Sequence, residues 1–194
     1  MSALENEISV EIVQKQFDQS LQQFDIRKFT QAPLRMRGSF QFNRNVDDVF
    51  AKVTDPQLIA SWFGMVKGGS VDHSNSCNAG QWGAGSKRYC NTSMGLLDES
   101  IYHWDAPYLC AYNVKSWSMP IKDHCAVMMI KPLTHDTCEL TWLQYFNYKG
   151  LVMRHFFPKM MLKMMNGGLA DLAEEFGGMG GKMELLKLNA QGDQ

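Results

Sequence analysis

Residues 42–64 read FNRNVDDVFAKVTDPQLIASWFG, and this short stretch contains two complete helix signals. Asn45 can cap the first helix, because its side-chain oxygen can accept a hydrogen bond from a backbone N–H of the opening turn. Asp55-Pro56 ends this helix and begins the second, since proline is tolerated at the first helical position. Gly64 then ends the second helix. The apolar residues of the first helix recur at helical spacing, at Val46, Val49, Phe50 and Val53.

The chain on both sides of this stretch has the patterns of β-strands. Residues 35–42 alternate between polar and apolar side chains, which is typical of a half-buried strand. Farther along, Asp105-Ala106-Pro107 and Met119-Pro120 separate apolar segments by short turns, which favours antiparallel neighbours. The strands expected after the two helices are residues 65–73, 85–92, 96–105, 108–118, 121–132 and 138–148.

Two longer helices are expected, one before this series of strands in the chain and one after it. Residues 9–25 carry an apolar stripe of Val13, Phe17, Leu21 and Phe24. The last helix begins at Leu151 or at Pro158, because proline lacks a backbone N–H and either begins a helix or kinks it. It ends at Gly177-Gly178.

The order of these elements predicts an α+β fold. One curved seven-stranded antiparallel sheet surrounds a long C-terminal helix, with two short helices after the first strand and an extra N-terminal helix. We therefore expect a helical extension at residues 1–33, one domain at 34–176, and a glycine-rich, loosely ordered tail at 177–194.

The composition excludes several classes of protein. The 194 residues include 19 Lys and Arg against 20 Asp and Glu, and 45% are hydrophobic. A chain this apolar and evenly charged is not disordered, and it lacks the basic excess of a nucleic-acid binder. Its apolar runs, such as 126–130, are far shorter than the roughly 20 residues of a membrane helix. With no signal-peptide pattern at its start, we expect a cytoplasmic protein.

The cysteines and histidines do not predict a metal site. The five cysteines are widely spaced and form no CxxC pair, so neither a disulfide framework nor a zinc ribbon is indicated. The histidines show no HxH or HExxH spacing. No glycine-rich nucleotide loop follows a strand, so we expect no metal and no cofactor.

The element order and several local motifs resemble the SRPBCC superfamily over residues 34–176. The matching motifs are the stretch quoted above, Gly83–Arg88, Glu99–Ile101, Asp105–Pro107 with Tyr112, and Thr141-Trp142. This superfamily includes START-like lipid carriers and polyketide cyclase/dehydrase-like proteins. The resemblance implies a helix-grip fold with a deep apolar cavity between the sheet and the long helix. Members bind lipids, aromatic polyketides or other hydrophobic molecules there; some catalyse cyclisation or dehydration, and others act by protein contact.

Three polar residues and one histidine are candidates for chemistry in such a cavity. Arg88 and Glu99 fall on adjacent strands, where they either orient a ligand or form a cross-strand ion pair. Tyr112 either donates its hydroxyl to a ligand carbonyl or packs in the core. His103 shares the predicted face of Glu99 and could act as an acid or base. The candidate catalytic residues are Glu99, His103 and Tyr112.

Methionine is the unusual feature of the composition, with 14 residues. Met153, Met160, Met161, Met164 and Met165 all fall on the last helix. They either fill an ordinary core, form an exposed face for a homodimer, or provide a flexible wall that adapts to a ligand. The candidate ligand-binding residues are Trp62, Arg88, Glu99, Tyr112, Trp142, Phe146, Phe157, Met161, Met164 and Met165.

These observations lead to three functional hypotheses. The first is binding of a hydrophobic small molecule (lipid, aromatic or polyketide-like) between the sheet and the C-terminal helix, without membrane insertion. The second is a cyclase or dehydratase acting on such a ligand. The third is a partner-binding adaptor that uses the N-terminal helix.

Overall fold

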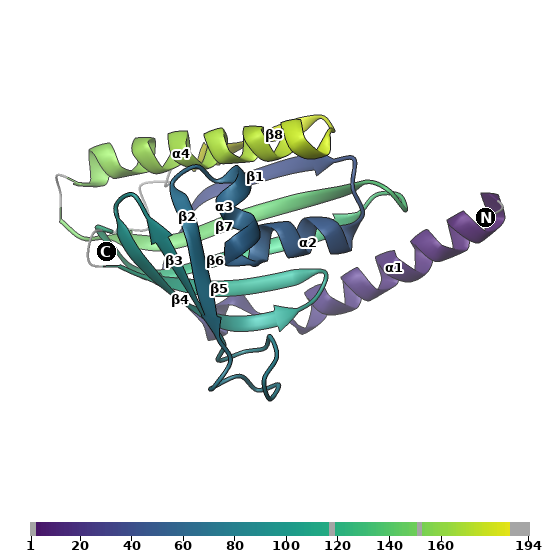
Figure 1. Ribbon diagram of the computed structural model, residues 1–194, viewed down its shortest axis with the longest axis horizontal. Helices are drawn as coiled ribbons and strands as arrows, with labels where there is room; N and C mark the ends of the chain where they lie inside the picture. The colour runs from purple at the N-terminus through teal and green to yellow at the C-terminus, as the bar shows by residue number, and fades with distance from the viewer. Residues whose placement is uncertain (1–2, 117–118, 151–152, 187–194) are drawn as a thin grey trace.

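The computed structural model describes residues 3–116, 119–150 and 153–186, and it confirms the α+β helix-grip fold (Figure 1). The elements, in chain order, are α1 (Ala3–Gln23), a short 3-10 helix η1 (Ile26–Lys28), β1 (Leu34–Phe42), α2 (Val46–Thr54), α3 (Pro56–Trp62), β2 (Val66–Asp72), β3 (Lys87–Thr92), β4 (Gly95–Asp105), β5 (Leu109–Lys115), β6 (Ile121–Pro132), β7 (Cys138–Tyr148), α4 (Met153–Phe176) and β8 (Gly180–Leu185).

The strands form a single antiparallel sheet in the order β2-β3-β4-β5-β6-β7-β1-β8. Helix α4 runs along one face of this sheet, which we call the inner face, and α2 and α3 lie against the same side (Figure 1). None of the described helices is long and apolar enough to span a membrane.

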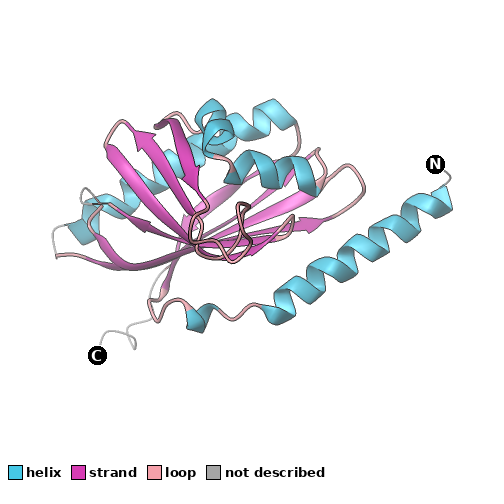
Figure 2. Cartoon of the chain, turned by 60° about the horizontal axis from the view of Figure 1, so that its bottom comes forward, coloured by secondary structure: helices cyan, strands magenta, loops and turns pink. Residues whose placement is uncertain are grey.

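The outer face of the sheet has a smaller cover. The end of α1 and the segment that follows it pack there on a second apolar cluster of four buried residues, Leu109, Ala111, Cys125 and Val127. The Tyr108 hydroxyl donates a hydrogen bond to Gln16 of α1 at 2.7 Å. The N-terminal part of α1 extends away from the rest of the molecule (Figures 1 and 2). The predicted N-terminal helix is therefore present as an appendage to the sheet.

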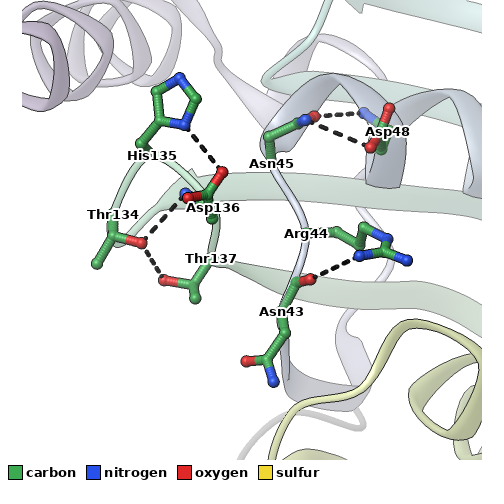
Figure 3. A network of polar contacts seen from close by, with 8 residues as sticks. All are labelled: Asn43, Arg44, Asn45, Asp48, Thr134, His135, Asp136 and Thr137. Carbon is green, nitrogen blue, oxygen red and sulfur yellow. Dashed lines mark hydrogen bonds and ion pairs between the residues drawn. The ribbon is translucent and has the colours of Figure 1, made fainter. Parts of the chain in front are cut away.

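The two short helices begin as the sequence predicts. The Asn45 side chain accepts a hydrogen bond from the backbone N–H of Asp48 at 2.9 Å and so caps α2 (Figure 3). Asp55 caps α3 in the same way and Pro56 is its first residue. The turn between β6 and β7, residues 134–137, lies beside this cap, where Thr134 and Thr137 hydrogen-bond to each other at 2.8 Å (Figure 3).

Within the described residues the sheet has eight strands, so the prediction of seven was wrong. The additional strand is β8, residues 180–185, which pairs with β1. We expected these residues to lie within a loosely ordered tail. The backbone geometry requires glycine at two positions, one in this strand and one just before it. A Cβ atom at Gly181 would overlap the backbone carbonyl oxygen of Ser39, and Gly178 has a positive φ of 125°. Residues 187–194 lie outside the described part of the chain.

Of the two starts expected for the last helix, Leu151 and Pro158, the structure excludes the second. Pro158 lies inside the helix, which begins at Met153 in the described chain, and its ring is buried. Pro158 therefore does not begin the helix.

Substitution of Asn166 by alanine is expected to release β8 from the sheet. The Asn166 amide accepts a hydrogen bond from the Met183 N–H at 2.8 Å and donates one to the Met183 carbonyl at 3.1 Å. Asn166→Ala should therefore lower the free energy of unfolding by about 1–2 kcal/mol and raise amide hydrogen exchange in residues 181–185. Asn147→Ala, which removes a surface hydrogen bond to Asp123, is the control and should leave that exchange unchanged. Unaltered exchange in Asn166→Ala would show that the strand holds without this side chain.

Candidate functional site

A cavity of about 80 Å³ lies between the inner face of the sheet and α4. Side chains from α4 cover it on one side, and side chains from strands β4 to β7 form the opposite wall. Its lining is Phe63, Met65, Met94, Leu97, Glu99, Tyr112, Val114, Met119, His124, Trp142, Gln144, Phe157, Met161, Met164 and Met165. Most of these side chains are apolar, and the polar ones are few, which is typical of small-molecule sites.

Methionine dominates the cavity wall. Six of the 14 methionines of the chain line it: Met65, Met94, Met119, Met161, Met164 and Met165. The last three come from α4, as the sequence predicts. By contrast, Met160 of the same helix is 41% exposed on the outer side. The methionine excess is therefore concentrated around one cavity, and it includes residues from loops that sequence periodicity did not connect with the helix.

The structure brings together seven of the ten candidate ligand-binding residues in the cavity wall and excludes three. Trp62 is buried beside the cavity, where its indole N–H donates to the Lys52 carbonyl at 3.1 Å, and its neighbour Phe63 lines the cavity instead. Phe146 is fully buried against Tyr148. Arg88 is bound to Glu99 and does not line the cavity. The seven that line the cavity are Glu99, Tyr112, Trp142, Phe157, Met161, Met164 and Met165.

Arg88 and Glu99 form a buried ion pair between β3 and β4, where they are direct cross-strand partners. The Arg88 guanidinium also donates to the Thr54 carbonyl at 2.6 Å and lies 4.8 Å from the centre of the Tyr112 ring. Burial is the largest single effect and acts against the charged form of Arg88. The Glu99 carboxylate and the other nearby groups, Tyr112 among them, together outweigh it, so the pKa of Arg88 is raised. The cross-strand ion pair, one of the two alternatives for these residues, is therefore present, and only its carboxylate reaches the cavity.

Tyr112 is the third polar candidate and it is buried in the cavity wall. Burial is the largest cause that raises the pKa of its hydroxyl well above the ordinary value, and the nearby Glu99 carboxylate adds to the effect. The hydroxyl is consequently protonated and can act as a hydrogen-bond donor.

His103 does not face the cavity, contrary to the expectation that it shares a face with Glu99. Strand β4 contains a bulge at Tyr102, because Ile101 pairs with Tyr112 whereas His103 pairs with Ala111. The extra residue reverses the alternation, so His103 points to the outer face. There the centre of its ring lies 5.4 Å from the centre of the Phe24 ring. Burial there lowers the pKa of His103. The structure thus separates His103 from the other two catalytic candidates.

His124 and Gln144 line the cavity and were not among the candidate residues. The His124 Nδ1 atom accepts a hydrogen bond from the Val114 N–H at 3.0 Å. The Nε2 atom lies 2.8 Å from the Gln144 Oε1 atom, so it carries the proton and donates it to that oxygen. Burial lowers the pKa of His124 to about 4, and the ring is neutral at pH 7. A glutamine between the apolar residues Trp142 and Phe146 was the sequence signal for this pair.

A larger groove lies on the outer face, but its chemistry is different. It measures about 580 Å³ and is lined by residues 27–32 and by polar side chains that include Asn113, Asp123 and Asn147. Exposed polar side chains of this kind are ordinary protein surface. The cavity under α4 is therefore the candidate functional site.

Comparison with known proteins agrees with this geometry. Residues 33–177 match the family model described as polyketide cyclase / dehydrase and lipid transport. No curated protein matches the sequence significantly.

Solved structures share the fold at low sequence identity. A solution structure from Thermobifida fusca has 22% identity and a TM-score of 0.59, with 74% of this chain and 93% of that chain covered. A START superfamily protein from Mycobacterium smegmatis has 14% identity and a TM-score of 0.56, covering 73% and 98%. An HSP90 activator from Plasmodium falciparum has 9% identity and a TM-score of 0.58, covering 75% and 97%. At these identities the likeness shows the fold alone, whereas the family model spans most of the chain. The chain belongs to the polyketide cyclase / dehydrase and lipid transport family of the SRPBCC superfamily.

Proposed function

We propose that this protein binds a hydrophobic small molecule in the cavity between the sheet and α4. The observation that carries the proposal is the wall itself, in which six methionines surround a few buried polar groups. Methionine side chains are flexible and polarizable, and they are over-represented at surfaces that accept ligands of different shape. The description of the family, which includes lipid transport, supports the same function.

The size of the cavity determines how a ligand could enter it. Drug-sized ligands occupy pockets of roughly 300–1,000 Å³, and this cavity measures about 80 Å³. A lipid or polyketide therefore requires the methionine side chains to change rotamer and α4 to move outward. A small aromatic molecule needs a smaller adjustment, and it is the appropriate first probe.

Ethylbenzene should bind in the cavity and shift the methyl resonances of the methionines that line it. In protein labelled with ¹³C at the methionine methyl groups, the ring current of the probe should move the signals of residues such as Met161 and Met165. The signals of Met160 and Met179, which are exposed, should stay in place. Shifts in the exposed methyl groups alone would show that the probe binds elsewhere.

Two substitutions on α4 test whether ethylbenzene binds in the cavity or elsewhere on the protein. Met164→Trp should fill the cavity with an indole ring and weaken ethylbenzene binding at least tenfold, whereas Met160→Trp, on the outer side of α4, should leave the Kd unchanged. Calorimetric titration measures both. Equal Kd values in the two variants would contradict the proposed site.

A second candidate function, catalysis, is favoured by the presence of Glu99 and Tyr112 in the same cavity wall. A carboxylate and a protonated phenol can take part in general acid–base chemistry on a held ligand. Because Glu99 also holds Arg88, Tyr112→Phe is the cleaner test. Unchanged turnover of a confirmed substrate in this variant would exclude the role of the phenol.

A further inference from the structure

Trp142 carries a buried hydrogen-bond donor with no acceptor among the described residues. It stands in the middle of β7, pairs with Gly38 and Met128 on its two sides, and is 5% exposed. Its side chain lines the cavity, yet the indole N–H makes no hydrogen bond in the part of the chain that the structure describes. Leaving a buried donor unpaired is costly, and such groups in native proteins have a reason.

A second donor lies on the same face of β7, two residues farther along. Because the Val114 N–H occupies Nδ1 of His124, the other ring nitrogen carries the proton and must donate to the Gln144 Oε1 atom. This fixes the orientation of the Gln144 amide and turns its NH₂ group away from His124. Trp142 and Gln144 therefore both present N–H groups on the inner face of the strand.

The charged side chain in the cavity wall, Glu99, is acidic. Glu99 lines the cavity, but its partner Arg88 does not and is already bound to Glu99 and to the Thr54 carbonyl. A ligand carboxylate would therefore meet a carboxylate, and no Lys or Arg is among the described residues that line the cavity. An unpaired charge is expensive at such a buried position. An anionic ligand is disfavoured for this reason.

We propose that the cavity selects neutral apolar ligands that carry a hydrogen-bond acceptor such as a ketone, ester or quinone carbonyl, with the Trp142 indole N–H as the donor. This inference rests on the proposed function and specifies the chemical class of its ligand. The methionine wall supplies contact with the apolar body of the ligand, while Trp142, assisted by Gln144, holds the carbonyl oxygen. Trp142 is then a specificity-determining residue rather than ordinary core.

Three probes of similar size test the proposal: acetophenone, ethylbenzene and benzoate at pH 7. In protein labelled with ¹⁵N, acetophenone should shift the Trp142 indole N–H resonance downfield, and ethylbenzene should not produce this hydrogen-bond shift. Benzoate should bind at least tenfold more weakly than acetophenone. The loss of the Trp142 signal in Trp142→Phe assigns it among the five tryptophans.

The affinities are compared as ratios, because acetophenone and ethylbenzene differ in hydration. Trp142→Phe should weaken acetophenone binding about tenfold relative to ethylbenzene, which corresponds to the loss of one buried hydrogen bond. Trp62→Phe is the matched control, since the Trp62 N–H is already bonded to Lys52 and lies outside the cavity; it should leave the ratio unchanged.

The outcomes distinguish this inference from the proposed function. Binding of ethylbenzene with no indole shift by acetophenone, or with the same affinity ratio in wild type and Trp142→Phe, would overturn the selectivity for carbonyls and leave an apolar binding site. Failure of both neutral probes to bind would contradict the binding function itself. If Trp142→Phe does not fold, the indole shift in the wild-type protein still decides the question.

Discussion

Replacement of Arg88 by methionine is expected to destabilise the protein by about 3–5 kcal/mol, because it leaves the Glu99 carboxylate buried without its partner. Both side chains are almost completely buried, and Arg88 also satisfies the Thr54 carbonyl at the end of α2. The substitution therefore removes the charge compensation and one link between the sheet and the short helices. Urea unfolding at pH 7 measures the loss.

The double variant Arg88→Met/Glu99→Leu tests whether charge is the cause. Replacing a whole buried ion pair by apolar residues is often neutral or stabilising, so the double variant should recover most of the stability that Arg88→Met loses. A double variant as unstable as the single one would instead assign the effect to packing and to the bond with Thr54.

The same hairpin provides a matched control on its other face. Lys87 and Asp98 form an ion pair at 3.2 Å, but both side chains are about one third exposed. Lys87→Met should therefore destabilise the protein far less than Arg88→Met, since water screens an exposed pair and solvates the partner that remains. A loss similar to that of Arg88→Met would show that burial is not what makes the inner pair important.

The elements of this fold could be predicted from sequence because their signals are local. Asn45 and Asp55 begin two helices by accepting hydrogen bonds from backbone N–H groups with their side chains, and Pro56 contributes its fixed φ. The structure has both helices where these residues place them. The alternation in β7 also placed Trp142 and Gln144 on the inner face, where both line the cavity. Periodicity was sufficient wherever a strand or helix was regular.

Prediction from sequence failed where a distant partner determines the local structure. Residues 180–185 contain two charged side chains and two glycines. They form a strand because β1 and the Asn166 side chain supply the hydrogen bonds. The bulge at Tyr102 follows from pairing with β5, and it moved His103 to the outer face. Neither the pairing of β8 nor the bulge in β4 produces a periodic pattern in the sequence of the segment concerned.

Lowering the pH from 7 to 4 should remove about 3 kcal/mol of stability through His124 alone. In the unfolded chain this histidine has an ordinary pKa of 6.5, whereas burial lowers the pKa of the folded state to about 4. Between these values the unfolded chain binds a proton that the folded protein does not, so the free energy of unfolding falls as the pH falls. Above pH 6.5 the ring is neutral in both states and the contribution is complete.

His124→Asn isolates this contribution, because the Asn oxygen can still accept a hydrogen bond from Val114 but cannot be protonated. The difference in unfolding free energy between wild type and variant should shrink steadily from pH 6.5 to pH 4, while carboxylates that titrate in both proteins cancel. A constant difference between wild type and His124→Asn would mean that the folded protein accepts the proton. That result would also mean that the Val114 N–H loses its acceptor at low pH, because a proton on Nδ1 would face it, donor against donor.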